Sequence, residues 1–182
     1  MGKEFAEIDE TVRQWVEKQK MFFVATAPMA QDGLVNCSPK GMDSFRVLGP
    51  RTVAYLDLTG SGVETIAHLR ENKRIVIMMC AFDGPPKIFR FYGKGEVIEK
   101  GSSQYDEHID NFQELPGARS IIHVELDLIR DSCGYSIPLY ENVGDRDVLT
   151  KWSENKGEDG VKEYIRQNNR TNLDGMPGID AN

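Results

Sequence analysis

The 182-residue chain lacks several features that mark well-known classes of protein. It has no apolar run near the roughly 20 residues that a membrane-spanning helix needs. Its acidic start contains no apolar signal segment, so we expect a cytoplasmic protein. Basic residues number 22 against 29 acidic ones, a net charge of −7 that nucleic-acid backbones and anionic membranes would repel. We therefore expect neither nucleic acid nor a membrane among its partners.

Cysteine is scarce, and two familiar motifs are missing. Cys37, Cys80 and Cys133 are isolated, form no CxxC pair and are odd in number, which is typical of reduced thiols and not of a disulfide framework. The three histidines are scattered, with neither HxxxH nor HxH spacing, so the sequence predicts no metal site. No GxGxxG motif opens a helix, which argues against a dinucleotide-binding Rossmann fold.

Short alternating segments dominate the chain. Strand-like patterns cover residues 21–27, 34–39, 45–48, 51–58, 74–82, 87–99 and 119–130, and turn signals separate most of them. Helical spacing occurs at residues 5–19, from the 60s to about 72, and at 102–112, 147–157 and 161–169. Ser102 or Ser103 is a suitable cap for the third of these helices. Gly93 and Gly95 interrupt the longest alternating strand, where it could bend.

These patterns predict a mainly β protein with peripheral helices, built around a six- to seven-stranded antiparallel barrel. We expect a single domain over residues 1–182. Its parts are an N-terminal helix at 1–20, the barrel at 21–131 and a helical tail at 132–182.

The stretch GSGVETI, residues 60–66, lies between a strand pattern and a helix pattern. Backbone N–H groups at a helix start bind phosphate well, and Ser61 and Thr65 would add hydroxyl donors. The alternative is an ordinary capping box, in which Ser61 caps the helix and Glu64 bonds back to it. The residues alone leave both interpretations open.

The ordered set FFVATA, DG, NCSPKG, VAYLD, GSGVETIAHLREN, RIVIMM and IFRFYGKG resembles the pyridoxamine 5'-phosphate oxidase-like superfamily over residues 20–98. The resemblance implies an FMN-binding split β-barrel and an FMN-dependent oxidoreductase. It also implies a homodimer with FMN sites at the subunit interface. One face of the isoalloxazine ring would be open to a small-molecule substrate.

The resemblance also implies which residues hold FMN. Asn36, Cys37 and Ser38 would lie beside the flavin ring, and Pro39 would loosen the strand end next to it. Lys40 matches the family lysine that reaches the flavin phosphate or the pyrimidine edge.

The phosphate would rest on Ser61, Gly62 and Thr65. Arg90, on an otherwise apolar strand, would bind either this phosphate or a carboxylate such as Asp57.

The sequence departs from the family at two places. Glu64 and Thr65 stand where pyridoxamine phosphate oxidases usually carry an Arg-Lys pair, and the tail lacks their Trp and Arg-x-His-Asp-Arg ending. Oxidation of pyridoxamine phosphate itself is therefore not expected. The alternatives are a barrel without a ligand site and a non-catalytic flavin- or haem-binding protein. Haem would take His68, His108 or His123 as its axial ligand.

Overall fold

The computed structural model describes residues 2–113 and 115–179, and one antiparallel sheet forms its centre. Seven strands follow one another in the order β3-β2-β6-β7-β8-β5-β4, and a short eighth strand, β1, pairs with β8. The strands are β1 (Glu4–Phe5), β2 (Phe22–Thr26), β3 (Asn36–Lys40), β4 (Phe45–Gly49), β5 (Thr52–Leu58), β6 (Arg74–Cys80), β7 (Ile88–Glu99) and β8 (Ala118–Ser132). The predicted mainly β fold, an open antiparallel barrel, is confirmed.

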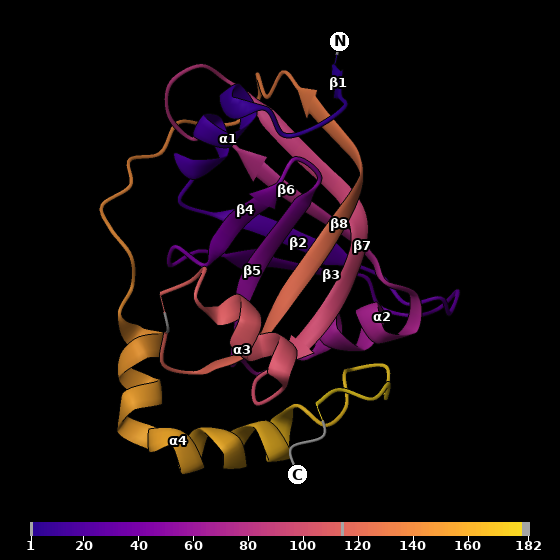
Figure 1. Cartoon of the computed structure of the whole chain (residues 1–182), viewed down its shortest axis with the longest axis vertical. Coiled ribbons are helices and arrows are strands. Elements are labelled where there is room, and N and C mark those ends of the chain that lie inside the picture. Colours follow the sequence, from indigo (N-terminus) through magenta and orange to yellow (C-terminus); the bar gives the residue numbers. More distant parts are fainter. Residues whose placement is uncertain (1, 114, 180–182) are drawn as a thin grey trace.

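Four helices surround the sheet (Figure 1). They are α1 (Glu10–Glu17), α2 (Glu64–Asn72), α3 (Ser103–Ile109) and α4 (Val148–Asn168). The structure confirms the predicted Ser102 cap of α3, because its side chain accepts a hydrogen bond from the Tyr105 N–H. Helix α4 consists of two helical pieces joined at Gly157, whose φ of 66° is not helical, as the two separate patterns predicted. None of the helices in the described ranges is long and apolar enough to cross a membrane.

The N-terminal helix is shorter than predicted. Helix α1 begins at Glu10, because the Asp9 side chain accepts a hydrogen bond from the Val12 N–H and so caps the N-terminus of the helix. The residues before it include β1, which pairs with the far end of β8. Helical spacing from residue 5 onward therefore arose from an apolar strand residue, Phe5, that packs against the same core as α1.

The two longest strands, β7 and β8, pair along most of their length and bend together. Their register shifts between Tyr92 and Gly93, at one of the two glycines where a bend was predicted. A Cβ atom on Gly93 would lie 2.1 Å from the Glu125 carbonyl oxygen, so only glycine fits this close approach. The bulge increases the local twist and helps the sheet to curve.

Curvature of the sheet encloses one large apolar core. Phe22, Tyr55, Phe91 and Ile122 are almost fully buried in it, and they come from four different strands. Strands β3 and β4 lie at the two ends of the strand path, so the barrel is open between them. Residues 133–147 leave the end of β8, run beside the sheet and lead into α4 (Figure 1). The site described next lies near the open side and this connecting segment.

Candidate functional site

A buried cluster of three charged side chains lies across the open side of the barrel. Asp57, near the end of β5, has a side chain only 1% exposed. Lys40 at the end of β3 places its Nζ 2.9 Å from Asp57 Oδ1. Arg119 at the start of β8 places its Nε 2.7 Å from Asp57 Oδ2. Strand β3 is at one end of the strand path and β5 is next to the other end, so the Lys40–Asp57 pair connects distant parts of the sheet.

The two cations keep Asp57 ionised. Burial alone would raise the pKa of the Asp57 carboxyl, but Arg119 and Lys40 outweigh burial and lower this pKa from 3.8 to about 2. Two cations and one carboxylate leave the cluster with one net positive charge. The anionic surface of the protein thus contains a local basic site.

Only Lys40 can offer this charge to a ligand. Arg119 is 5% exposed, and its other contacts are to the Gly62 carbonyl oxygen at 3.0 Å and to Asn169 Oδ1 at 2.8 Å. The Lys40 side chain is 21% exposed and donates to Asp57. A lysine ammonium has three donors, so Lys40 has donors beyond the one that Asp57 accepts, and its side chain lines the cleft described below.

The predicted cofactor residues of β3 divide between the two faces of the strand. Asn36, Ser38 and Lys40 are half-buried and alternate with the exposed Cys37 and Pro39. Alternation along the strand places the side chains of Asn36 and Ser38 on the same face as Lys40 and those of Cys37 and Pro39 on the other face. Pro39 nevertheless lines the cleft described below together with Lys40.

On the half-buried face, polar contacts extend from β3 to α2. Ser38 donates to Asn36 Oδ1 at 3.3 Å, and Asn36 Nδ2 donates to Thr65 Oγ1 at 3.0 Å. The structure thus brings four of the predicted residues to one side of the site: Asn36, Ser38, Lys40 and Thr65.

The loop at residues 59–63 does not form the capping box that the sequence offered as the alternative to phosphate binding. Helix α2 begins at Glu64, its N-cap residue is Val63, and no side chain caps it. The capping-box interpretation of Ser61 is therefore wrong, since Ser61 lies two residues too early and is exposed. The N–H groups of residues 60–66 donate to none of the described residues. The Glu64 carboxylate lies against Gly62, where a Cβ atom would be 2.2 Å from Glu64 Oε2.

Arg90 lies apart from this cluster. It pairs with Met78 of β6 and Arg130 of β8, and its guanidinium donates to Ser132 Oγ at 2.9 Å. The suggested carboxylate partner, Asp57, is wrong, because Lys40 and Arg119 occupy that carboxylate. Arg90 lies on β7, which two strands, β2 and β6, separate from β3 in the sheet, and Arg90 does not line the cleft beside Lys40.

His68 is fully buried on α2, and both of its ring nitrogens have partners. Nδ1 lies 3.0 Å from Thr26 Oγ1, and Nε2 lies 3.4 Å from Asn172 Nδ2. The Asn172 Oδ1 accepts from the N–H groups of Asp174 and Met176, so its NH₂ group faces the ring. Burial lowers the pKa of His68, which fits a neutral ring accepting at Nε2. His68 therefore has no free nitrogen for a haem iron.

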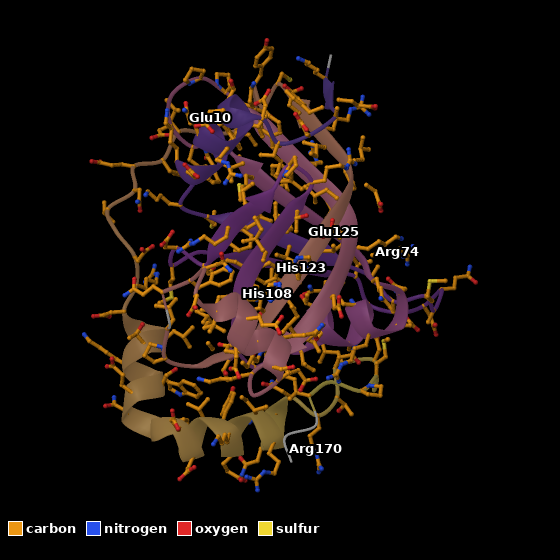
Figure 2. The ribbon with its side chains drawn as sticks, in the orientation of Figure 1. Glu10, Arg74, His108, His123, Glu125 and Arg170 are labelled. Carbon is orange, nitrogen blue, oxygen red and sulfur yellow. The ribbon has the colours of Figure 1, made fainter. Side chains whose placement is uncertain are left out.

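The other two histidines lie on a different surface. His108 of α3 and His123 of β8 meet edge to face, with ring centroids 5.5 Å apart (Figure 2). Glu125 is nearby, with its Oε1 3.9 Å from His123 Nε2. Across residues 2–113 and 115–179, no group of three or more potential ligands could hold a metal ion.

A cleft of about 1390 Å³ opens beside Lys40. It lies between the end of β3, the residues after α1, the segment that follows β8, and α4. Its aromatic side chains belong to Phe82, Tyr140, Trp152 and Tyr164. Its basic side chains belong to Lys18, Lys20, Lys40 and Arg146, and none of the three histidines lines it. A cleft of this size can hold a cofactor together with a substrate.

The open antiparallel sheet with its peripheral helices defines the class of split β-barrels. Comparison with known proteins places the chain within that class. The pyridoxamine 5'-phosphate oxidase family matches residues 8–133, and the chain belongs to this family. The family suggested by the ordered sequence motifs is therefore confirmed.

Individual relatives agree with this placement. The pyridoxamine 5'-phosphate oxidase family protein ustO of Aspergillus flavus is 38% identical over 196 aligned residues, which cover 97% of this chain and 78% of ustO.

Two solved structures share the fold. HupZ of Group A Streptococcus superposes with a TM-score of 0.54 at 20% identity, covering 69% of this chain and 99% of HupZ. A putative pyridoxamine 5'-phosphate oxidase of Lactobacillus delbrueckii superposes with a TM-score of 0.53 at 15% identity, covering 70% of this chain and 98% of that structure.

Sequence reasoning missed Arg119 and Asn169, and it considered Asp57 only as a partner of Arg90. Arg119 opens the strand pattern RSIIHVELDLIR, and a buried arginine needs an anionic partner. Asp57, the only acidic residue in VAYLDL, is that partner. One charged residue in each of two otherwise apolar strand patterns was therefore the signal for this ion pair. Asn169 gave no signal, because the partners of its side chain, Arg119 and Gly60, lie more than 40 residues away in sequence.

Proposed function

We propose that this protein is an FMN-dependent oxidoreductase that holds FMN in the cleft beside Lys40, with the phosphate on the Lys40 ammonium. The observation that carries the proposal is the net positive charge of the buried cluster, which Lys40 alone presents at the cleft. Membership of the pyridoxamine 5'-phosphate oxidase family supports it. So does the size of the cleft.

The residues present fit this cofactor. Lys40 has donors to spare, and loop 59–63 reaches the same cleft through Thr59 and Gly60. The unpaired N–H groups that follow in this loop are the donor type that phosphate needs. The unfavourable groups are the Glu64 carboxylate, which lies against Gly62, and the acidic residues that line the cleft, Asp83, Glu141 and Asp145. The phosphate therefore depends on Lys40 more than in relatives with two cations at this helix.

Bound FMN would supply the hydride or electron transfer, and the side chains of this chain would bind and orient it. Lys40 would hold the phosphate, while Asp57 and Arg119 fix the position of Lys40. Asn36 and Ser38 lie on the same face of β3 as Lys40 but do not line the cleft, and their bonds to Thr65 and to each other would hold the end of β3 beside α2. The aromatic walls of the cleft would exclude water from the substrate side.

We also propose that the protein is a homodimer. Three apolar side chains in the segment between β8 and α4 are strongly exposed: Tyr135 at 82%, Leu139 at 75% and Val143 at 94%. Three exposed apolar side chains within one short segment support a covering partner. Sedimentation should show a dimer at micromolar concentration, and Val143→Asp should shift it toward monomer. A wild-type monomer would overturn this part of the proposal.

Identification of the bound cofactor tests the proposed function. Protein purified without added cofactor should release FMN on denaturation, identified by mass, in an amount close to that of the protein. A strong substrate-dependent bleaching of the flavin spectrum would support turnover. FMN that no tested reductant or substrate reduces would indicate a storage or sensing protein. A haem spectrum, or colourless protein that ignores added FMN, would contradict the proposal.

A further inference from the structure

The segment that follows α4, residues 169–179, lies against loop 59–63. Asn169 is fully buried, and its side-chain amide donates one hydrogen bond and accepts another. Its Nδ2 donates to the Gly60 carbonyl oxygen at 3.0 Å, and its Oδ1 accepts from Arg119 at 2.8 Å. One side chain of this segment thus connects the loop with the buried charge cluster.

Arg119 holds the second carbonyl of the same loop. It donates to the Gly62 oxygen at 3.0 Å, so the carbonyls of Gly60 and Gly62 have Asn169 and Arg119 as partners. In a trans peptide the C=O and the next N–H point in opposite directions. The N–H groups of Ser61 and Val63 therefore point away from these two side chains, and neither donates to a described residue.

A close backbone approach fixes the segment in place. A Cβ atom on Gly178 would lie 2.2 Å from the Asn169 carbonyl oxygen and 2.7 Å from Val63 Cγ1. The Ile179 N–H donates to the Asn169 carbonyl oxygen at 2.8 Å, and the Ile179 side chain is buried in the main core. The position of Asn169 is therefore determined by packing on both sides and by its own bonds.

From these contacts we infer that Asn169 is a positioning residue for phosphate binding. It acts through Gly60 and Arg119, and it orients the free N–H groups of loop 59–63 together with the cluster that contains Lys40. The inference rests on the proposed function, because the ligand it serves is the FMN phosphate. Riboflavin, which lacks the phosphate, should not depend on Asn169.

The test compares two asparagines that are adjacent in the chain. Asn169→Ala removes the bridge, whereas Asn168→Ala alters an exposed side chain whose bond among the described residues is to the Tyr164 carbonyl of its own helix. Titration of each full-length variant with FMN and with riboflavin should show a loss of about tenfold in FMN affinity for Asn169→Ala alone, on the scale of one hydrogen bond. Riboflavin affinity should stay within about twofold. Equal losses for both ligands, or no loss, would overturn the inference.

Hydrogen–deuterium exchange without ligand separates this inference from the proposed function. A peptide covering residues 59–69 should exchange faster in Asn169→Ala and as in wild type in Asn168→Ala. If wild-type protein binds no FMN, the proposed function fails. Unchanged exchange in Asn169→Ala would, in either case, refute the inference that Asn169 holds loop 59–63 in place. Should Asn169→Ala not fold, Asn169→Asp keeps an acceptor for Arg119, lacks the donor to Gly60, and should show the same faster exchange.

Discussion

Replacing Asp57 by asparagine tests the buried charge cluster most severely. The substitution keeps the shape of the side chain but leaves Lys40 and Arg119 without their shared carboxylate. Breaking a buried ion pair costs about 3–5 kcal/mol, because the remaining charge stays buried without compensation. Lys40 can turn toward the cleft, whereas Arg119 cannot, so we expect a loss near the lower end, about 3 kcal/mol. Asp43→Asn is the matched control, since it breaks the exposed Arg46–Asp43 pair and should cost at most about 1 kcal/mol.

Urea unfolding at several pH values is the assay. The pKa of Asp57 is lowered from 3.8 to about 2, so its stabilisation is complete above pH 3.8 and disappears as the pH falls toward 2. This shift corresponds to about 2 kcal/mol. The gap in unfolding free energy between wild type and Asp57→Asn should therefore be largest near neutral pH and shrink between pH 4 and pH 2. A gap as small as that of Asp43→Asn, or one that does not change with pH, would refute the reasoning.

Three further predictions concern single positions. Burial lowers the pKa of His68 below its ordinary 6.5, so the stability that its neutral form provides should be complete above pH 6.5 and decline as the pH falls below it; thermal unfolding of His68→Gln should lack this slope, and an unchanged slope would contradict it. Gly93→Ala should cost about 1–3 kcal/mol in urea unfolding because its Cβ has no room, whereas Gly60→Ala, with open space around it, should cost far less; equal losses would contradict the bulge account. Glu64→Lys should tighten FMN binding at low salt by replacing an anion with a cation at the start of α2, and the gain should fade as salt rises; an unchanged dissociation constant at low salt would place the phosphate elsewhere.

Much of the fold could be predicted because its signals are local. Gly49 and Pro50 separate two strand patterns that do form a hairpin, and Gly93 marks the bulge that bends β7. Ser102 precedes its helix at the spacing that a cap requires. Each of these signals lies within a few residues of the structure it determines.

The site could be predicted only in part because its contacts are distant in sequence. Lys40 was predicted to bind the cofactor, and the structure places it at the cleft; its pairing with Asp57 depends on how the two ends of the sheet approach each other. The Ser61 cap failed because α2 starts two residues later than the local pattern indicated. Asn169 joins the site only through the packing of a segment that the sequence presents as a tail.

The most direct measurement of the central claim is the affinity of Lys40→Ala for FMN and for riboflavin. If Lys40 holds the phosphate, FMN binding should weaken by about 1–3 kcal/mol, the scale of a charged hydrogen bond, while riboflavin binding stays within about twofold. Lys20→Ala, which removes another cation of the same cleft, should have a much smaller effect that vanishes at high salt. Equal losses of FMN and riboflavin affinity in Lys40→Ala, or an FMN affinity equal to that of wild type, would contradict the account.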